Sequence, residues 1–143
     1  MRPAIVLACF LLMAAACKKS GDKITISSIN GTWKYIGYSG GLAGFKLTGV
    51  EHPFYIAFKD ATRQYTITEE GGYTFCGSYT LDYDSLYHTP LVILDRKLLS
   101  DSLYEISFKE NQLRLYPHYW ADAFMYHFEA RPESLKACNK SGD

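Results

Sequence analysis

Bulky apolar and polar residues alternate along most of this 143-residue chain, and this pattern restricts its fold more than any other feature. A period of two places neighbouring side chains on opposite faces of a β-strand. The run from Gln64 to Glu69, for example, places Tyr65 and Ile67 on the same face. No segment shows the apolar stripe that is typical of an amphipathic helix. The pattern predicts strands over Thr32–Ser39, Phe54–Lys59, Gln64–Glu69, Tyr73–Leu81, Leu91–Leu94, Leu103–Lys109, Gln112–Tyr116 and Phe124–Arg131.

Short turn signals separate these runs. Lys59-Asp60-Ala61, Glu70-Gly71-Gly72 and Glu110-Asn111 each leave only a few residues between two runs, which is the spacing of antiparallel hairpins. Many short strands with one apolar face each predict an all-β, up-and-down meander that closes into a barrel or folds into a sandwich. Gly40 to His52 is rich in glycine and lacks alternation, so we expect a long loop there that can include a short helical turn.

The N-terminus is typical of a bacterial lipoprotein signal. Arg2 precedes an apolar run from Ala4 to Ala16, and three alanines stand directly before Cys17. A membrane-spanning helix needs roughly 20 apolar residues, and Lys18 ends this run too soon. We therefore expect cleavage before Cys17 and acylation of its thiol. The chain then divides into a signal peptide (1–16), a lipidated cysteine with a flexible polar tether (17–28), a β-domain (29–131) and a C-terminal tail (132–143).

Composition and motifs exclude several classes of function. Lysine and arginine balance aspartate and glutamate at 15 each, so the chain lacks the basic field of a nucleic-acid-binding protein. The histidines lack the spacing of a zinc site, and neither a nucleophile elbow nor a phosphate-binding glycine loop is present. Asp82 and Asp84 share a strand face, but a solvated pair at a loop explains them more simply than acid–base catalysis. The sequence predicts no enzymatic activity, no metal and no cofactor.

Several short motifs resemble those of lipocalins. Gly31-Thr32-Trp33 resembles the Gly-x-Trp signature, and its continuation to Tyr35 looks like the opening of the short lipocalin-like domains in Bacteroidetes-type lipoproteins. Gly77–Asp82, Ile106–Leu115 and the last strand, which ends at Arg131, resemble the middle and final strands of those domains. The resemblance covers Ile29 to Arg131. It implies a small antiparallel barrel of about eight strands and a small hydrophobic ligand.

The resemblance also implies a place in the cell. Such domains are anchored in the bacterial cell envelope, mainly in the outer membrane, through the lipid on Cys17. Lys18-Lys19-Ser20 lacks the acidic cluster that accompanies surface export in these lipoproteins, which favours the periplasmic face. The expected partners are the membrane, a small hydrophobic ligand and an envelope protein.

A late arginine packs on the signature tryptophan in lipocalins, and Arg131 is the residue that matches it here. Trp33 on the inner face of the first strand would plug one end of a barrel. A cation over an indole face contributes roughly 0.5–2 kcal/mol. The alternative is that Trp33 is an ordinary core residue and Arg131 an ordinary surface charge.

Two cysteines remain once the signal is removed and Cys17 is acylated. Alternation places Cys76 on the outer face of its strand, and Cys138 lies in the tail, which could run back along that wall. Many lipocalins tie their C-terminal segment to a middle strand in this way, and the envelope outside the cytoplasm is oxidising. We expect a Cys76–Cys138 disulfide, with two free thiols as the alternative.

Two functions remain open for such a barrel. It can hold a small apolar molecule, or its own side chains can fill it and leave function to its loops. In the second case, the loop from 116 to 124 is the expected protein-interaction site, with Tyr116, His118, Tyr119 and Trp120 as contacts. The same loop could instead be a lid over the barrel. The expected ligand-lining residues are Trp33, Tyr35, Ile56, Phe58, Phe75, Tyr79, Ile106, Phe108, Leu113, Leu115, Tyr126 and Phe128.

Overall fold

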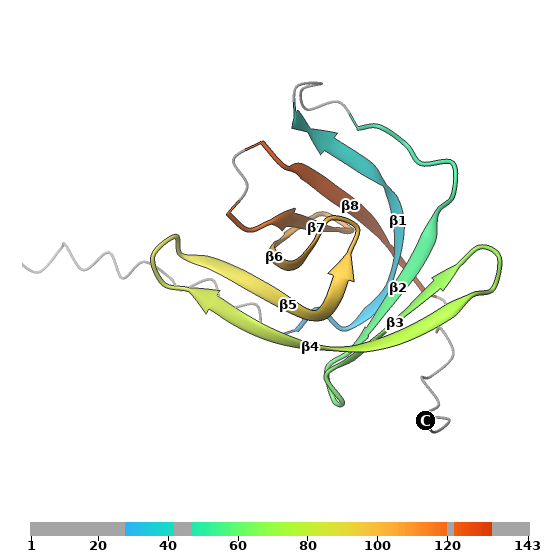
Figure 1. The fold of residues 1–143 in the computed structure, drawn as a ribbon, viewed down its shortest axis with the longest axis horizontal. Helices are drawn as coiled ribbons and strands as arrows, with labels where there is room; N and C mark the ends of the chain where they lie inside the picture. The colour runs from blue at the N-terminus through green and yellow to red at the C-terminus, as the bar shows by residue number, and fades with distance from the viewer. Residues whose placement is uncertain (1–27, 42–46, 120–121, 133–143) are drawn as a thin grey trace, which may run out of the picture.

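Eight antiparallel strands follow one another around a closed barrel in chain order, which confirms the predicted all-β barrel (Figure 1). The computed structural model describes residues 28–41, 47–119 and 122–132. Within these ranges there is no helix of the length and apolarity needed to cross a bilayer. The strands are β1 (Gly31–Gly40), β2 (Phe54–Lys59), β3 (Gln64–Glu69), β4 (Thr74–Asp84), β5 (Thr89–Leu98), β6 (Asp101–Lys109), β7 (Gln112–Pro117) and β8 (Phe124–Arg131).

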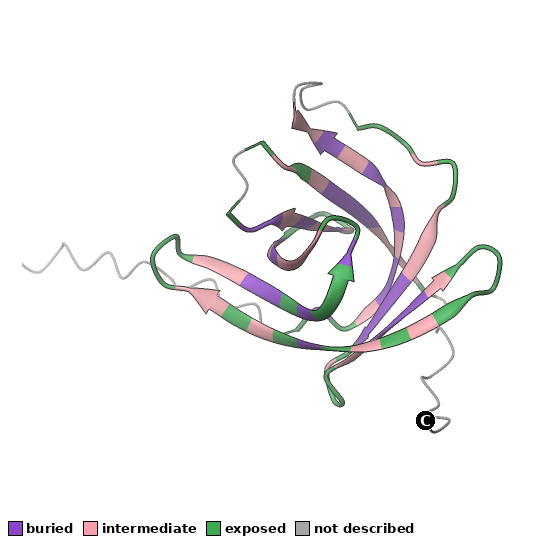
Figure 2. Ribbon diagram, viewed as in Figure 1, coloured by how far each residue is buried: buried purple, intermediate pink, exposed green. Residues whose placement is uncertain are grey.

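Strand pairing places the large apolar side chains together inside the barrel. On β2 and β3, Ile56 lies opposite Ile67 and Phe58 opposite Tyr65, and all four are buried. Exposed residues lie at the hairpin tips and along the outer faces of β4 and β5 (Figure 2). The alternation predicts the inward direction of Ile56 and Phe58, because successive side chains of a strand point to opposite faces. The buried core comprises Ile29, Trp33, Tyr35, Ile56, Phe58, Tyr65, Ile67, Tyr79, Val92, Leu94, Leu98, Tyr104, Ile106, Leu113, Leu115, Tyr126 and Phe128.

The two ends of the barrel differ. Where the chain enters β1, Ile29 and Trp33 are buried, and Trp33 Nε1 donates a hydrogen bond to the Ile29 carbonyl at 3.1 Å. The Phe108 ring lies against the indole, with 5.8 Å between ring centroids. We call this the sealed end. At the other end, which we call the mouth, lie the β1–β2, β3–β4 and β5–β6 connections.

A glycine lets the β1–β2 loop fold back onto β1. The register shifts between Tyr35 and Gly37, and Gly37 has a φ of 144°. Beyond this bulge, Tyr38 and Thr48 exchange two backbone hydrogen bonds at 3.0 and 2.7 Å. A Cβ at Gly37 would lie 2.9 Å from the Thr48 carbonyl carbon and overlap its oxygen. Only glycine fits here, because both the space and the positive φ exclude a side chain.

A second glycine, Gly77, allows close packing where β4 meets β5. The Tyr65 hydroxyl crosses Gly77 and donates to Asp95 Oδ1 at 2.9 Å, and a Cβ at Gly77 would overlap the Tyr65 ring. The Ser78 backbone N–H donates to Asp95 Oδ2 at 2.8 Å. Burial by itself raises the pKa of Asp95, but the hydrogen bonds from Ser78 and Tyr65 outweigh it and hold the pKa below its ordinary value. The pairing of β4 with β3 ends at Ser78, and the pairing of β4 with β5 begins at Tyr79. The Asp95 carboxylate therefore extends the hydrogen bonding between β4 and β5 by one residue.

Strands β4 and β5 extend further than the sequence predicts. The expected runs ended at Leu81 and Leu94, whereas β4 continues to Asp84 and β5 to Leu98. The extra residues include Asp82, Asp95, Arg96 and Lys97. Because these side chains are polar, the apolar alternation in the sequence does not reach the ends of the two strands. The extensions lengthen the β4–β5 hairpin and carry Leu98 to the mouth.

Candidate functional site

A cavity of about 370 Å³ opens at the mouth of the barrel. This volume lies within the range of small-molecule sites, which runs from roughly 300 to 1,000 Å³. Apolar and aromatic side chains from five strands form its floor, and charged side chains stand at its edge. We call it the mouth cavity, and it is lined by Tyr35, His52, Phe54, Ile67, Glu69, Phe75, Lys97, Leu98 and Leu99.

Tyr35 gives the floor of the mouth cavity a polar group. The side chain is only 5% exposed, yet within the described residues its hydroxyl makes no hydrogen bond. Burial, followed by the nearby hydroxyls of Tyr126 and Tyr38, raises the pKa of Tyr35 to about 12, so the phenol is neutral and can donate. The Tyr35 oxygen is not one of the buried side-chain atoms that lack a partner, so it is open to solvent in the mouth cavity. A ligand atom that accepts this hydrogen bond would take the place of water.

Most of the predicted lining residues do not face a cavity. Trp33, Phe58, Leu113 and their neighbours in the predicted set are packed against one another in the core. Of that set, Tyr35 and Phe75 line the mouth cavity. Phe108 is 43% exposed, because it is close to the end of β6 at the sealed end. Alternation therefore predicts which residues belong to the core, whereas the mouth cavity lies above the core.

The predicted contact between Trp33 and Arg131 is wrong. Trp33 pairs with Ala130, and Arg131 pairs with Thr32 on the neighbouring position of β1. Paired residues point to the same face, so Trp33 faces inward and Arg131 outward. Arg131 forms an ion pair with Glu129 at 2.8 Å on that outer face. The indole instead contacts Phe108.

Cys76 is exposed on the outer face of β4, as alternation predicts, and it is disulfide-bonded. The other cysteine of this bond is not among the described residues, so the pairing with Cys138 stays a prediction. Seven extended residues, 132–138, would span about 23 Å, enough to cross the four strand spacings of about 19 Å in total between β8 and β4. One row of paired positions crosses that wall: Arg131, Thr32, Ala57, Thr66 and Cys76.

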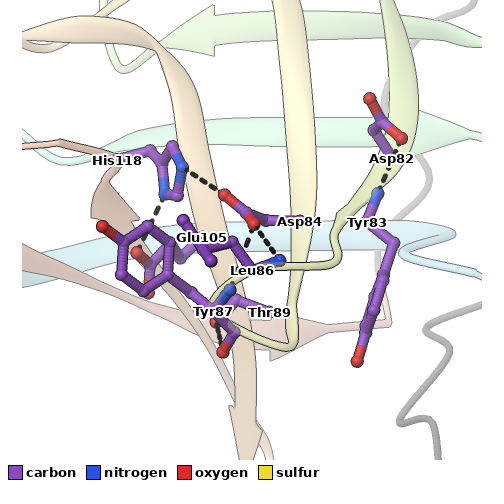
Figure 3. Close-up of polar contacts among 8 residues, drawn as sticks. All are labelled: Asp82, Tyr83, Asp84, Leu86, Tyr87, Thr89, Glu105 and His118. Carbon is purple, nitrogen blue, oxygen red and sulfur yellow. Dashed lines mark hydrogen bonds and ion pairs between the residues drawn. The ribbon is translucent and has the colours of Figure 1, made fainter.

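The predicted interaction loop contains a buried histidine rather than four exposed contacts. His118 is 2% exposed, and its two ring nitrogens lie 2.9 Å from Glu105 Oε1 and 3.0 Å from Asp84 Oδ2 (Figure 3). Carboxylates only accept hydrogen bonds, so both contacts form together only when the imidazole is protonated. Because neither nitrogen is free, His118 holds the β7–β8 loop to β6 and to the β4–β5 turn. We call these three residues the His118 clamp.

The other residues of that loop differ in exposure. Tyr116 is half-buried on β7, whereas Tyr119 is 78% exposed and has a φ of 72°. The Tyr119 ring stacks on the His118 imidazole with centroids 3.9 Å apart. The prediction for Trp120 falls outside the described residues. Among the described residues of this loop, Tyr119 therefore presents an exposed ring that stacks on a buried imidazole.

A second buried histidine lies on the outer face of β8. His127 Nε2 is 2.7 Å from the Ser39 hydroxyl oxygen, and both residues are buried. Burial, followed by the positive charge of Arg114, lowers the pKa of His127. Protonation of this imidazole is therefore less favourable in the folded state than in the unfolded chain. The unfolded chain accepts a proton at His127 as the pH falls below about 6.5.

We expect this difference to make stability depend on pH. In the range just below the ordinary histidine pKa the unfolded chain binds more protons at His127, so the contribution of this residue to the free energy of unfolding falls as the pH drops from 7 to 5. His127→Gln should flatten this dependence, because glutamine stays neutral. The melting temperature measured across this range tests the expectation, with His52→Gln, at an exposed histidine, as the control. An unchanged slope in the His127 variant would show that other groups cause it.

In comparisons with known proteins, no family model, no curated protein and no solved structure matches the chain. Within the described ranges, no three histidine, cysteine, aspartate or glutamate side chains cluster as metal ligands. The assignment of function therefore depends on the geometry of the mouth cavity and of the surface around the His118 clamp.

Sequence reasoning missed part of both sites. Phe54 and Ile67 lie on predicted strands, and alternation from Ile56 along its strand places Phe54 on the same face, so the residues near the mouth ends of these strands could have been included. Leu98 and Leu99 come from the unpredicted end of β5 and from its turn. Nothing in the sequence pairs Asp84 with His118, which are 34 positions apart.

Proposed function

We propose that this chain is a lipid-anchored binding protein of the bacterial envelope that holds a small amphipathic molecule in the mouth cavity. The observation that carries the proposal is the cavity itself, with its apolar floor, the unpartnered Tyr35 hydroxyl and a charged edge. Binding sites for small molecules are mostly apolar with a few placed polar groups. The packed core below the cavity favours a ligand bound at the mouth over one enclosed in the barrel.

The lining residues indicate the chemistry of the ligand. Phe54, Ile67 and Phe75 can pack against an aliphatic or aromatic body. Tyr35 can donate to an oxygen or nitrogen acceptor at its buried end. Lys97 and Glu69 place both charges at the edge, where a polar end of the molecule would meet solvent.

The proposed anchor rests on the N-terminal sequence. Ala14-Ala15-Ala16 before Cys17 supports cleavage and acylation, and the polar residues 18–28 supply a tether to the first strand. An anchored carrier needs no catalytic group. The resemblance of Gly31-Thr32-Trp33 to lipocalins supports the same function, because the barrel has the strand number and order expected from it.

Native mass spectrometry of the full chain purified in mild detergent tests the proposal. We expect an excess mass that disappears on denaturation, either as purified or after incubation with decanoate as an amphipathic probe. A bare mass in both samples would overturn ligand binding and favour the filled-barrel interaction module. The chain mass itself reports whether Cys17 carries a lipid.

Filling the mouth cavity should abolish binding. Phe75→Trp adds volume at a half-buried lining position, and we expect it to weaken decanoate binding at least about tenfold, measured by isothermal titration calorimetry. Phe108→Trp makes the same exchange at the sealed end and should leave the affinity unchanged. Equal affinities in the two variants would place the ligand elsewhere.

A further inference from the structure

Three exposed apolar side chains surround the His118 clamp on the outside of the barrel. Leu86 and Tyr87, in the β4–β5 turn, are 76% and 63% exposed, and Tyr119 follows the clamp histidine directly. The Tyr87 and Tyr119 rings both contact the His118 imidazole, with centroids 6.1 and 3.9 Å from it. We call Leu86, Tyr87 and Tyr119 the aromatic surface. It is separate from the mouth cavity, because no residue lines both.

Polar contacts hold the β4–β5 turn in place beneath this surface. Asp84 Oδ1 accepts hydrogen bonds from the backbone N–H groups of Leu86 and Tyr87 at 2.8 and 3.1 Å, while Oδ2 contacts His118 (Figure 3). The bond from Tyr87, with those from Leu86 and His118, lowers the pKa of Asp84. Thr89 Oγ1 donates to the Tyr87 carbonyl at 3.1 Å. The rings are thus presented by ordered backbone, which reduces the entropy lost on binding.

Carboxylates lie beside the aromatic surface, and an arginine, Arg114, lies further along the same outer wall, opposite Ser107. Asp82 and Glu105 lie in one row across β4, β5 and β6, with Leu91 between them. No lysine or arginine occurs in 81–95, 98–108 or 115–130, although the whole chain carries 15 basic residues. The clamp joins two carboxylates to one imidazole, so this region is acidic. An exposed aromatic surface with an acidic border is complementary to a basic segment.

We propose that the aromatic surface binds a basic segment of a partner protein, one that presents arginine or lysine beside an apolar side chain. The cation would lie over the Tyr87 or Tyr119 ring and near Asp82 and Glu105. The apolar side chain would pack on Leu86. Exposed tyrosines on ordered loops are typical of interaction hot spots.

Fluorescence anisotropy with defined peptides tests this surface on the full chain in mild detergent. The probe is a fluorescein-labelled peptide of three Gly-Arg-Leu repeats, and the comparison peptide has glutamate in place of arginine. We expect the arginine peptide to bind at least about tenfold more tightly, and its binding to weaken as salt screens the charges. Equal affinities for the two peptides, or no binding of either, would overturn the proposal.

Two variants localise the binding. Tyr87→Ala combined with Tyr119→Ala should weaken the arginine peptide at least about tenfold without changing the melting temperature, because both rings are exposed. Tyr73→Ala removes an equally exposed tyrosine from the β3–β4 turn and should leave the affinity unchanged. Asp82→Asn should weaken binding while leaving both rings in place. Undiminished binding by the double variant, or peptide-independent dimerisation that the double variant abolishes, would overturn the assignment of a basic partner segment.

Discussion

Trp33→Ala is expected to lower the free energy of unfolding by about 3–5 kcal/mol, the usual cost of removing a buried aromatic side chain. The indole is 9% exposed, contacts Phe108 and donates a hydrogen bond to the Ile29 carbonyl. Alanine would leave a cavity at the sealed end and a carbonyl without its donor. Urea unfolding followed by circular dichroism measures the change without depending on tryptophan fluorescence.

Two matched variants separate the contributions to this effect. Trp33→Phe keeps an aromatic ring but loses the hydrogen bond, so its loss of stability should be smaller. Phe108→Ala removes the stacking partner, and we expect a smaller loss because that ring is partly solvent-exposed. A wild-type midpoint for Trp33→Ala would mean that the indole does not hold the sealed end together.

Gly37→Ala is expected to lower the free energy of unfolding by about 2–4 kcal/mol, since an added Cβ combines overpacking with an unfavourable φ. The new methyl would overlap the Thr48 carbonyl, and the loop could avoid it only by breaking the hydrogen bonds between Tyr38 and Thr48. That loop leads directly into His52 and Phe54 of the mouth cavity. Decanoate affinity, measured at a temperature where the variant is folded, should therefore fall as well.

Gly49→Ala provides the control for this prediction. A Cβ at Gly49 meets no atom within 4 Å, and the residue belongs to the same loop. We expect its stability and its decanoate affinity to match the wild type. If both glycine variants behaved alike, the overlap with Thr48 would not be the cause of the loss.

The strands could be predicted because each carries its own local signal. Phe54–Lys59 and Gln64–Glu69 match β2 and β3 at both ends, since turn residues flank an unbroken alternation. The position of Trp33 in the core followed from the same rule. The bounds of a strand and the face on which each residue lies depend on alternation within that strand, and a single sequence contains this information.

Contacts between strands depend on register, which a single sequence does not contain. A shift of one residue on β8 would have placed Arg131 on the same face as Trp33, but Ala130 occupies that position. The His118 clamp depends on contacts between strands as well. The sequence predicts Asp84 as a solvated loop residue, because nothing local links it to His118. The mouth cavity was missed because its edge is built by loops and by the polar end of β5.

The sealed end also determines which way the barrel faces. β1 begins beside Ile29 and Trp33, so the proposed tether leaves the domain at the end opposite to the mouth cavity. An upright domain on that tether would direct its opening into the aqueous compartment rather than toward the proposed lipid anchor. The ligand would then be taken up from solution or from a facing protein. The bilayer would determine where the protein is located, but it would not supply the ligand.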